Sequence, residues 1–283
     1  MAGEVVDANG SPRFKVEDQV FGAIPVPESF KSGQGALAQY AYVPASAITH
    51  RPENISPNEA SGIAIVAITA YAAVYQIGKL EAGQRIFING GSTSVGMYVI
   101  QFAKALGCKV YASASGKNED FLKSLGVDVV RIYPPRRFRP LTGGQFYDYT
   151  KQPIHEALVQ NPPSSKFDVI LEAVGRACVP LFTHSEAYLA PNGTYISVGP
   201  TPDGVGETLS LIWNVFMRPK WAGGTKRQFQ YVPNPPLSSL TTLSVNFLSN
   251  RLLRAQKGAE VLAEITKMIA DGEPHHAYTR AFL

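Results

Sequence analysis

The chain of 283 residues has a formal net charge of +4, with 45% hydrophobic and 17% charged residues. It has enough apolar side chains for a sizeable core, and its charge is too small and scattered to indicate nucleic-acid binding. Two cysteines exclude a disulfide framework and a four-cysteine zinc site. The longest apolar run, residues 63–74, is shorter than the ~18 residues of a membrane span, and residues 1–10 do not resemble a secretory signal. We expect a soluble cytoplasmic protein, with the mitochondrion as the alternative location.

The first part of the chain predicts turns and short strands, with one strand over residues 16–22 and another over residues 38–43. A helix start follows. Ser56 can act as the N-cap, Pro57 suits the first helical position, and Glu59 completes a capping box. The helix is predicted to continue to Ile77, with Gly78 at its end.

From residue 84 onward, short apolar strands alternate with helices. Strands are predicted over residues 84–89, 109–114, 127–132, 167–173 and 193–198, and helices over 95–106 and 117–125. Strands that are apolar throughout and separated by helices indicate a parallel sheet covered on both faces. The predicted fold class is therefore α/β, a doubly wound parallel sheet of the Rossmann type. Such sheets bind ligands beyond the carboxyl ends of their strands.

A glycine-rich loop lies between the first of these strands and the following helix. Its residues are Gly90, Gly91, Ser92, Thr93, Ser94, Val95 and Gly96. The two leading glycines lack a Cβ atom and the hydroxyl residues are small, so a pyrophosphate can approach the backbone. The last glycine allows close helix packing, and the helix start offers unpaired N–H groups. The loop predicts dinucleotide binding; the alternative is an ordinary strand-to-helix turn.

The end of the second strand carries the next signal. Ser115, Lys117 and Asn118 follow this strand. A fold that prefers NAD places an acidic residue about twenty residues after the glycines to bind the ribose, and none stands at this strand end. A hydroxyl and an ammonium group suit a 2′-phosphate, so the sequence favours NADPH over NADH. The alternative is a solvated helix start.

With these features the chain resembles the medium-chain dehydrogenase/reductases. The resemblance is to their zinc-independent, quinone-oxidoreductase-like branch, which includes fungal proteins of the zinc-binding oxidoreductase type. The matching segments are residues 69–71, 80–83, 90–96, 101–107, 115–118, 125–128, 167–175 and 189–199. The resemblance implies an NADPH-dependent oxidoreductase that reduces a quinone, enone or related activated double bond by hydride transfer. It also adds residues to the expected cofactor site, namely Tyr149, Val174, Gly175, Val198 and Gly199.

The resemblance further implies a division into domains. Residues 1–58 are similar to part of a GroES-like catalytic domain, residues 59–274 to the NADPH-binding Rossmann domain, and residues 275–283 to the return to the catalytic domain. Relative to family members, the catalytic domain is expected to be truncated at both ends. Residues 131–146 are an insertion rich in Arg, Pro and Gly, either a basic surface loop or a translated intron.

No catalytic residue and no metal site is predicted. The histidines are scattered, and neither Cys108 nor Cys178 lies near one at ligand spacing. In zinc-independent relatives, a tyrosine of the opening strands of the catalytic domain often polarises the substrate. Residues 1–283 are expected to lack the counterpart of those opening strands. Two alternatives to a working reductase stay open: a catalytically impaired NADPH-binding protein, and a truncated gene product. The expected partner is a small-molecule substrate, with a homodimer as an open alternative.

Overall fold

The structure is a computed structural model that describes residues 1–128, 146–148, 153–175, 178–199, 205–219, 221, 224–232 and 261–270. The chain divides into two compact units, one formed by residues 1–68 and 233–283 and the other by Thr69–Val232. Tyr149, residues 131–145 and residues 275–283, each singled out in the sequence, lie outside the described residues.

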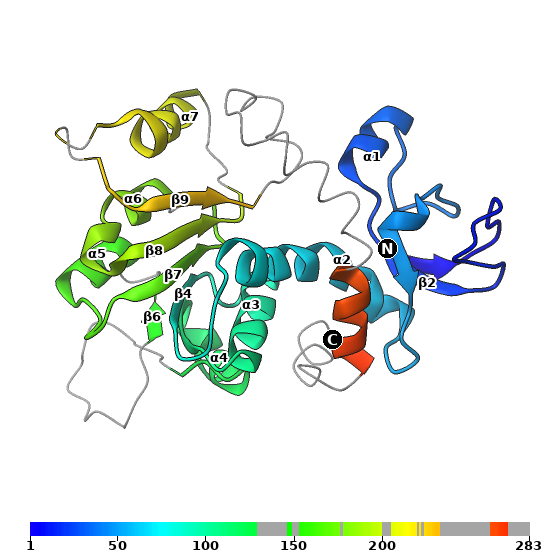
Figure 1. Ribbon diagram of the computed structural model, residues 1–283, viewed down its shortest axis with the longest axis horizontal. Helices are drawn as coiled ribbons and strands as arrows, with labels where there is room; N and C mark the ends of the chain where they lie inside the picture. The colour runs from blue at the N-terminus through cyan, green and yellow to red at the C-terminus, as the bar shows by residue number, and fades with distance from the viewer. Residues whose placement is uncertain are drawn as a thin grey trace. The chain divides into compact units, whose positions relative to one another are not determined.

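The first unit contains a small antiparallel sheet, consistent with part of a GroES-like domain (Figure 1). Its elements are β1 (Ala2–Glu4), β2 (Gln19–Gly22), α1 (Val26–Ser32), η1 (Ala45–Ala47) and β3 (Ile48–His50). Strand β2 is central, and Val20 pairs with both Gly3 of β1 and His50 of β3. Phe14, Val20 and Ile48 form the buried cluster beside this sheet. A further helix of this unit covers residues 261–270, and Asn54 Nδ2 donates to Ile269 O at 3.1 Å.

Two sequence predictions in this unit need correction. The strand expected from residue 16 begins only at Gln19, because Glu17 has a φ of 75°, which extended backbone does not adopt. The strand expected over residues 38–43 is not formed. Tyr40 and Tyr42 are exposed instead, and no described strand pairs with this segment. Its aromatic pattern suits a strand, but a strand also needs a partner.

Helix α2 (Pro57–Tyr71) begins at the predicted capping box. Ser56 N donates to Glu59 Oε2 at 2.8 Å, and Glu59 N donates back to Ser56 Oγ at 3.3 Å. The helix continues as the π-helical turn η2 (Ala72–Ile77) and ends at Gly78. The whole stretch is 21 residues long and contains an 18-residue window with a mean hydropathy of 1.6, so by length and composition it could cross a membrane. One such helix is weak evidence, since the core helix of a globular protein passes the same test, and 44% of this window is buried.

The second unit is built on a six-stranded parallel sheet in the order β6-β5-β4-β7-β8-β9 (Figure 1). Its elements are β4 (Arg85–Asn89), α3 (Ser94–Ala105), β5 (Lys109–Ala114), η3 (Gly116–Asn118), α4 (Glu119–Ser124), β6 (Phe146–Asp148), α5 (Ile154–Gln160), β7 (Phe167–Glu172), α6 (Cys178–Thr183), η4 (Ser185–Ala187), β8 (Leu189–Ser197), α7 (Val205–Ile212), η5 (Trp213–Met217) and β9 (Gln228–Tyr231). The chain starts in the middle, builds outward to β6, and then returns to build β7, β8 and β9. This is the doubly wound Rossmann arrangement that the sequence predicts, with its switch point at β4.

Helices cover both faces of this sheet. On one face, α5 and α6 pack against the strands, and Phe87, Phe167 and Tyr195 lie fully buried among them. On the other face, Ala112 of β5 lies near Leu122 of α4 and Ile100 of α3, and all three surround Gly91. Adjacent strand residues point to opposite faces, so strands buried on both sides read as continuous apolar runs.

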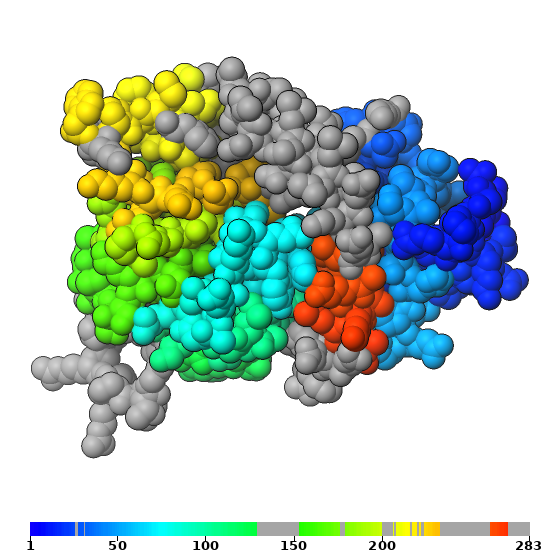
Figure 2. All heavy atoms as spheres, in the orientation of Figure 1, coloured from blue at the N-terminus to red at the C-terminus, as the bar shows by residue number. Residues whose placement is uncertain are grey.

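Three strands of the sheet differ from the sequence prediction, and one of them is β8, which begins at Leu189 and not at residue 193. Val127 and Asp128 are not in a strand; Asp128 Oδ2 instead accepts the N–H of Val110 of β5 at 2.9 Å. The third strand is β6, which pairs with β5 from Ala112 onward, and the rest of the predicted strand lies outside the described residues. Strand β9 is an addition. Figure 2 shows β9 in gold beneath α7 and η5 in yellow, at the surface of this unit.

Candidate cofactor site

The glycine loop leaves the carboxyl end of β4, the switch point of the sheet. Gly90 has a φ of 88°, and a Cβ atom placed on it would lie 2.7 Å from Val174 Cγ2. A Cβ atom on Gly91 would lie 2.8 Å from Ala112 Cβ, and one on Gly96 would overlap the carbonyl oxygen of Gly90. The three glycines therefore hold the loop close to β5, to α3 and to the turn after β7.

Thr93 caps helix α3. Its hydroxyl donates to Gly90 O at 2.7 Å and accepts the N–H of Gly96 at 3.1 Å. In the described part of the chain, the backbone N–H groups of Ser92, Ser94 and Val95 have no protein acceptor. They are the unsatisfied donors that a helix N-terminus presents to an anion.

A row of buried polar residues runs across the carboxyl ends of the strands. Ser113 of β5, Asn89 of β4, Glu172 of β7 and Ser197 of β8 are neighbours in register and are all at most 2% exposed. Gly90 N donates to Ser113 Oγ at 3.1 Å, and Ser113 Oγ donates to Asn89 Oδ1 at 2.7 Å. The row therefore connects the glycine loop to the interior of the sheet.

Glu172 continues the row toward the turn after β7. Its Oε1 atom accepts the N–H groups of Val174 and Gly175, each at 2.8 Å, and that of Asn89 Nδ2 at 3.4 Å. Burial raises the pKa of this carboxyl, and the two backbone donors and Asn89 oppose that rise. Among the described residues, its other oxygen, Oε2, and the neighbouring Ser197 Oγ are buried without a hydrogen-bond partner. The sequence analysis did not identify these four residues. Their signal is a polar side chain at or near the end of an otherwise apolar strand.

The residues expected near a 2′-phosphate lie at the carboxyl end of β5. Ser115 is half-buried, Lys117 is exposed, and both belong to the turn that leads into α4. Asn118 Nδ2 donates to Ser115 Oγ at 3.2 Å, while in the described residues Lys117 forms no ion pair. Glu119 is not at the strand end; it pairs with Lys123 within α4 at 2.7 Å.

The remaining predicted residues follow β7 and β8. Val174 is 44% exposed beside the glycine loop, and Gly175 has a φ of 87°. Val198 N donates to Glu172 O at 3.0 Å, and a Cβ atom on Gly199 would meet nothing within 4 Å. The structure thus places all the predicted residues except Tyr149, which lies outside the described ranges, at the same edge of the sheet.

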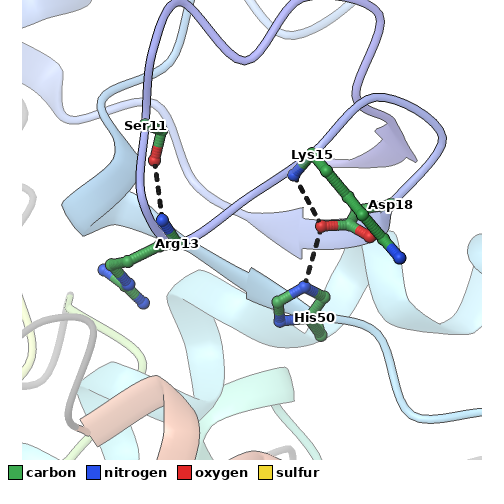
Figure 3. Close-up of polar contacts among 5 residues, drawn as sticks. All are labelled: Ser11, Arg13, Lys15, Asp18 and His50. Atoms are coloured by element: carbon green, nitrogen blue, oxygen red, sulfur yellow. Dashed lines mark hydrogen bonds and ion pairs between the residues drawn. The ribbon is translucent and has the colours of Figure 1, made fainter.

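The first unit holds a separate polar cluster (Figure 3). Asp18 Oδ2 accepts the N–H of Lys15 at 2.9 Å and lies 3.1 Å from His50 Nε2. The Lys15 N–H and the His50 ring lower the pKa of Asp18. Among the described residues, no three His, Cys, Asp or Glu side chains lie close enough together to hold a metal ion.

Comparisons with known proteins bear on the same region. Residues 94–220 match the profile of the zinc-binding dehydrogenase family. A trans-enoyl reductase of Penicillium oxalicum is 34% identical over 254 residues, which cover 80% of this chain and 60% of that protein. A chloroplastic quinone-oxidoreductase homolog of Spinacia oleracea is 34% identical over 184 residues, covering 62% of this chain and 53% of that protein. The chain therefore spans about half to three fifths of the length of these relatives.

Solved structures share the fold of this chain. An alcohol dehydrogenase superfamily protein from Novosphingobium aromaticivorans superimposes with a TM-score of 0.65 and 23% identity, over 96% of this chain and 68% of that one. The family match, the curated relatives and the shared fold together support membership of the medium-chain dehydrogenase/reductase superfamily. Members of this superfamily bind a nicotinamide cofactor. The matching family is described as zinc-binding, but the described residues of this chain bring no group of three His, Cys, Asp or Glu ligands together.

Proposed function

We propose that this chain binds NADPH along the carboxyl edge of its parallel sheet and reduces an activated carbon–carbon double bond or a quinone. The observation that carries the proposal is the glycine loop. Gly90, Gly91 and Gly96 occupy positions where a side chain would collide with the loop, α3 or the turn after β7. A pyrophosphate fits there because it needs close approach to the backbone and free N–H donors.

Hydrogen-bond donors for that pyrophosphate lie at the start of α3. The N–H groups of Ser92, Ser94 and Val95 lack protein partners within the described residues, and α3 is 12 residues long. Its macrodipole places partial positive charge at the same point. Thr93 orients the loop through its two hydrogen bonds, so little ordering remains for the bound state.

The choice of NADPH over NADH rests on the end of β5. Ser115 offers a hydroxyl and Lys117 an exposed ammonium, while the carboxylate of Glu119 is held by Lys123. A 2′-phosphate carries negative charge that a lysine attracts, whereas a carboxylate at this point would favour the free 2′-hydroxyl of NADH.

The bound cofactor would supply a hydride to an electrophilic carbon. The chain's own contribution is to hold the dinucleotide: the glycine loop and the start of α3 bind its phosphates, and Ser115 and Lys117 select it. The turns after β7 and β8, which carry Val174 and Val198, would lie beside its other half. The substrate class follows from the relatives, which are named an enoyl reductase and a quinone-oxidoreductase homolog.

The first test is the shift of the thermal melt with NADPH and, separately, with NADH. A ligand that binds only the folded state stabilises it by about 2.7 kcal/mol at a hundredfold excess over Kd. We expect a clear rise with NADPH and a smaller one with NADH. A cooperative melt that neither ligand shifts would refute the cofactor proposal. Turnover with quinones and enones then separates a reductase from a protein that only binds NADPH.

A matched pair of variants tests the 2′-phosphate contact. Lys117→Ala should weaken NADPH binding roughly ten- to a hundredfold and leave NADH binding unchanged, since one charge-assisted contact is worth about 1.5–3 kcal/mol. Lys109→Ala removes the same charge at the opposite end of β5, where Lys109 is also exposed. It should change neither affinity. Equal NADPH affinities for the two variants would contradict the role given to Lys117.

A further inference from the structure

We propose that Glu172 is the positioning residue for the nicotinamide half of the site, holding the Val174–Gly175 turn against the glycine loop. This inference rests on the proposed function and deepens it. Glu172 is fully buried and so does not touch a ligand directly. It acts through the backbone of the turn that follows its own strand.

The geometry of the carboxyl group is that of a backbone clamp. One oxygen, Oε1, accepts the N–H groups of Val174 and Gly175 at 2.8 Å each. Gly175 has a φ of 87°, so the chain reverses sharply there, and neither N–H can join a strand ladder. Without the carboxyl oxygen, both donors would lose their acceptor, Gly175 N in a buried place and Val174 N in a partly buried one.

The clamped turn sets the position of a side chain that faces the site. Val174 is 44% exposed, and its Cγ2 atom lies where a Cβ atom on Gly90 would be only 2.7 Å away. Ala173 N also donates to Asn89 O at 3.0 Å. The turn after β7 and the loop after β4 are therefore held in contact with each other, and Glu172 is the group that fixes the outer end of the turn.

The hydrogen bonds that Glu172 makes to the Val174–Gly175 turn belong to a longer chain of hydrogen bonds that reaches the glycine loop. Asn89 Nδ2 donates to Glu172 Oε1 at 3.4 Å, and Asn89 Oδ1 accepts a hydrogen bond from Ser113 Oγ. Ser113 Oγ in turn accepts a hydrogen bond from Gly90 N. On the far side, Ser197 of β8 is in register with Glu172. A leucine or methionine would fill the same volume at lower desolvation cost, so what the carboxyl group adds at this position is its accepting oxygen, Oε1.

The switch-point topology says which half of the dinucleotide depends on this clamp. In a doubly wound sheet the two mononucleotide halves lie on either side of the crevice, with the adenosine ribose at the end of the second strand. That strand is β5 here, while β7 lies on the other side of β4. The Val174–Gly175 turn therefore serves the nicotinamide half, and Ser115 and Lys117 serve the adenosine half.

The test compares two ligands that differ by one half. NADPH spans the whole site, and adenosine 2′,5′-bisphosphate occupies only the adenosine half. For Glu172→Ala we expect NADPH binding to weaken roughly tenfold, with the affinity for adenosine 2′,5′-bisphosphate within about twofold of the unaltered chain. Glu172→Gln keeps the accepting oxygen, so it should restore NADPH binding to within about twofold.

Asp168→Ala is the matched control. Asp168 lies on the same strand, and its carboxylate accepts the N–H of Arg85 at 2.8 Å, but near the amino end of the sheet. This variant should leave the NADPH affinity unchanged. If Glu172→Ala does not fold, Glu172→Asp replaces it, because it withdraws the carboxyl group by one methylene; its NADPH binding should weaken in the same selective way.

The outcomes separate this inference from the proposed function. If the unaltered chain binds neither ligand, the proposed function fails. If the unaltered chain binds both, equal NADPH affinity in the alanine or aspartate variant overturns the positioning role. A parallel loss of both ligands also overturns it, because a general structural defect does not distinguish the halves. Failure of Glu172→Gln to restore binding shows that the accepting oxygen is not what matters, and likewise overturns it.

Discussion

Replacing Gly96 by alanine introduces a methyl group at the closest contact between helix α3 and the glycine loop. The added Cβ atom would overlap Gly90 O and lie 3.0 Å from both the Cα and the carbonyl oxygen of Gly91. All three are backbone atoms, which cannot rotate away as the end of a side chain can. The loop must therefore move as a whole.

The cost can be worked out from the contacts that the movement breaks. Overpacking costs about 1–3 kcal/mol. Gly90 O also accepts two hydrogen bonds from Thr93, one from its hydroxyl at 2.7 Å and one from its N–H at 3.0 Å. Losing each costs about 1 kcal/mol, and the better helix propensity of alanine returns about 1 kcal/mol. We expect a net loss of about 2–4 kcal/mol in the free energy of unfolding.

Gly62→Ala is the control. Gly62 lies within helix α2, it is exposed, and a Cβ atom there would meet nothing within 4 Å. The same chemical change should therefore stabilise the protein by about 1 kcal/mol through helix propensity alone.

The assay is thermal unfolding followed by circular dichroism, with NADPH titration of each variant. Gly96→Ala should lower the Tm by roughly 4–15 °C and weaken NADPH binding at least tenfold, whereas Gly62→Ala should raise the Tm by roughly 2–4 °C and leave binding intact. If Gly96→Ala has the same Tm as Gly62→Ala and binds NADPH with normal affinity, the close approach of the loop and helix α3 is not what supports the site.

Three further substitutions test other parts of the structure. Glu17 has a left-handed φ of 75°, so Glu17→Gly should raise the free energy of unfolding by about 1 kcal/mol in urea titrations; a lower midpoint would contradict the strain. Ser56→Ala removes the side-chain half of the capping box and should lower that free energy by about 1 kcal/mol, and an unchanged midpoint would argue against the cap. Burial raises the pKa of Glu172 in the folded state, so its contribution to stability is fully present below the unfolded pKa and declines as the pH rises through the folded pKa. Glu172→Gln should remove this decline when the free energy of unfolding is compared between about pH 4 and about pH 8. If the free energy of unfolding of Glu172→Gln falls with pH as steeply as that of the unaltered chain, another group causes the decline.

Features set by neighbouring residues could be read from the sequence. The capping box at Ser56, the helix that follows Thr93 and the glycine loop depend on contacts within a few positions of one another. The apolar runs over β4, β5 and β7 were likewise apparent, because a strand buried on both faces has few polar residues. These local signals together predicted the doubly wound sheet, the glycine loop and the end of β5, whereas Val174, Gly175, Val198 and Gly199 were predicted from the family resemblance.

Other features depended on partners far along the chain. The segment over residues 38–43 has a strand-like pattern but pairs with no described strand, whereas β9 has a weak pattern and becomes a strand by pairing with β8. The hydrogen bonds by which Glu172 holds the turn after β7 could not be predicted from the sequence either. Its oxygen meets Val174 and Gly175 locally, but its burial and its link to Asn89 arise only when β4 and β7 lie side by side.

The sequence by itself determined the type of most elements, the glycine loop and the chemistry available at the end of β5, because these follow from short-range sterics and hydrogen bonding. The tertiary structure decided which strands are neighbours and thereby which loops meet. It also decided that four polar side chains, remote in the sequence, form one buried row beneath them. The physical reason is that strand pairing brings together residues up to about eighty positions apart, and no local pattern specifies that pairing.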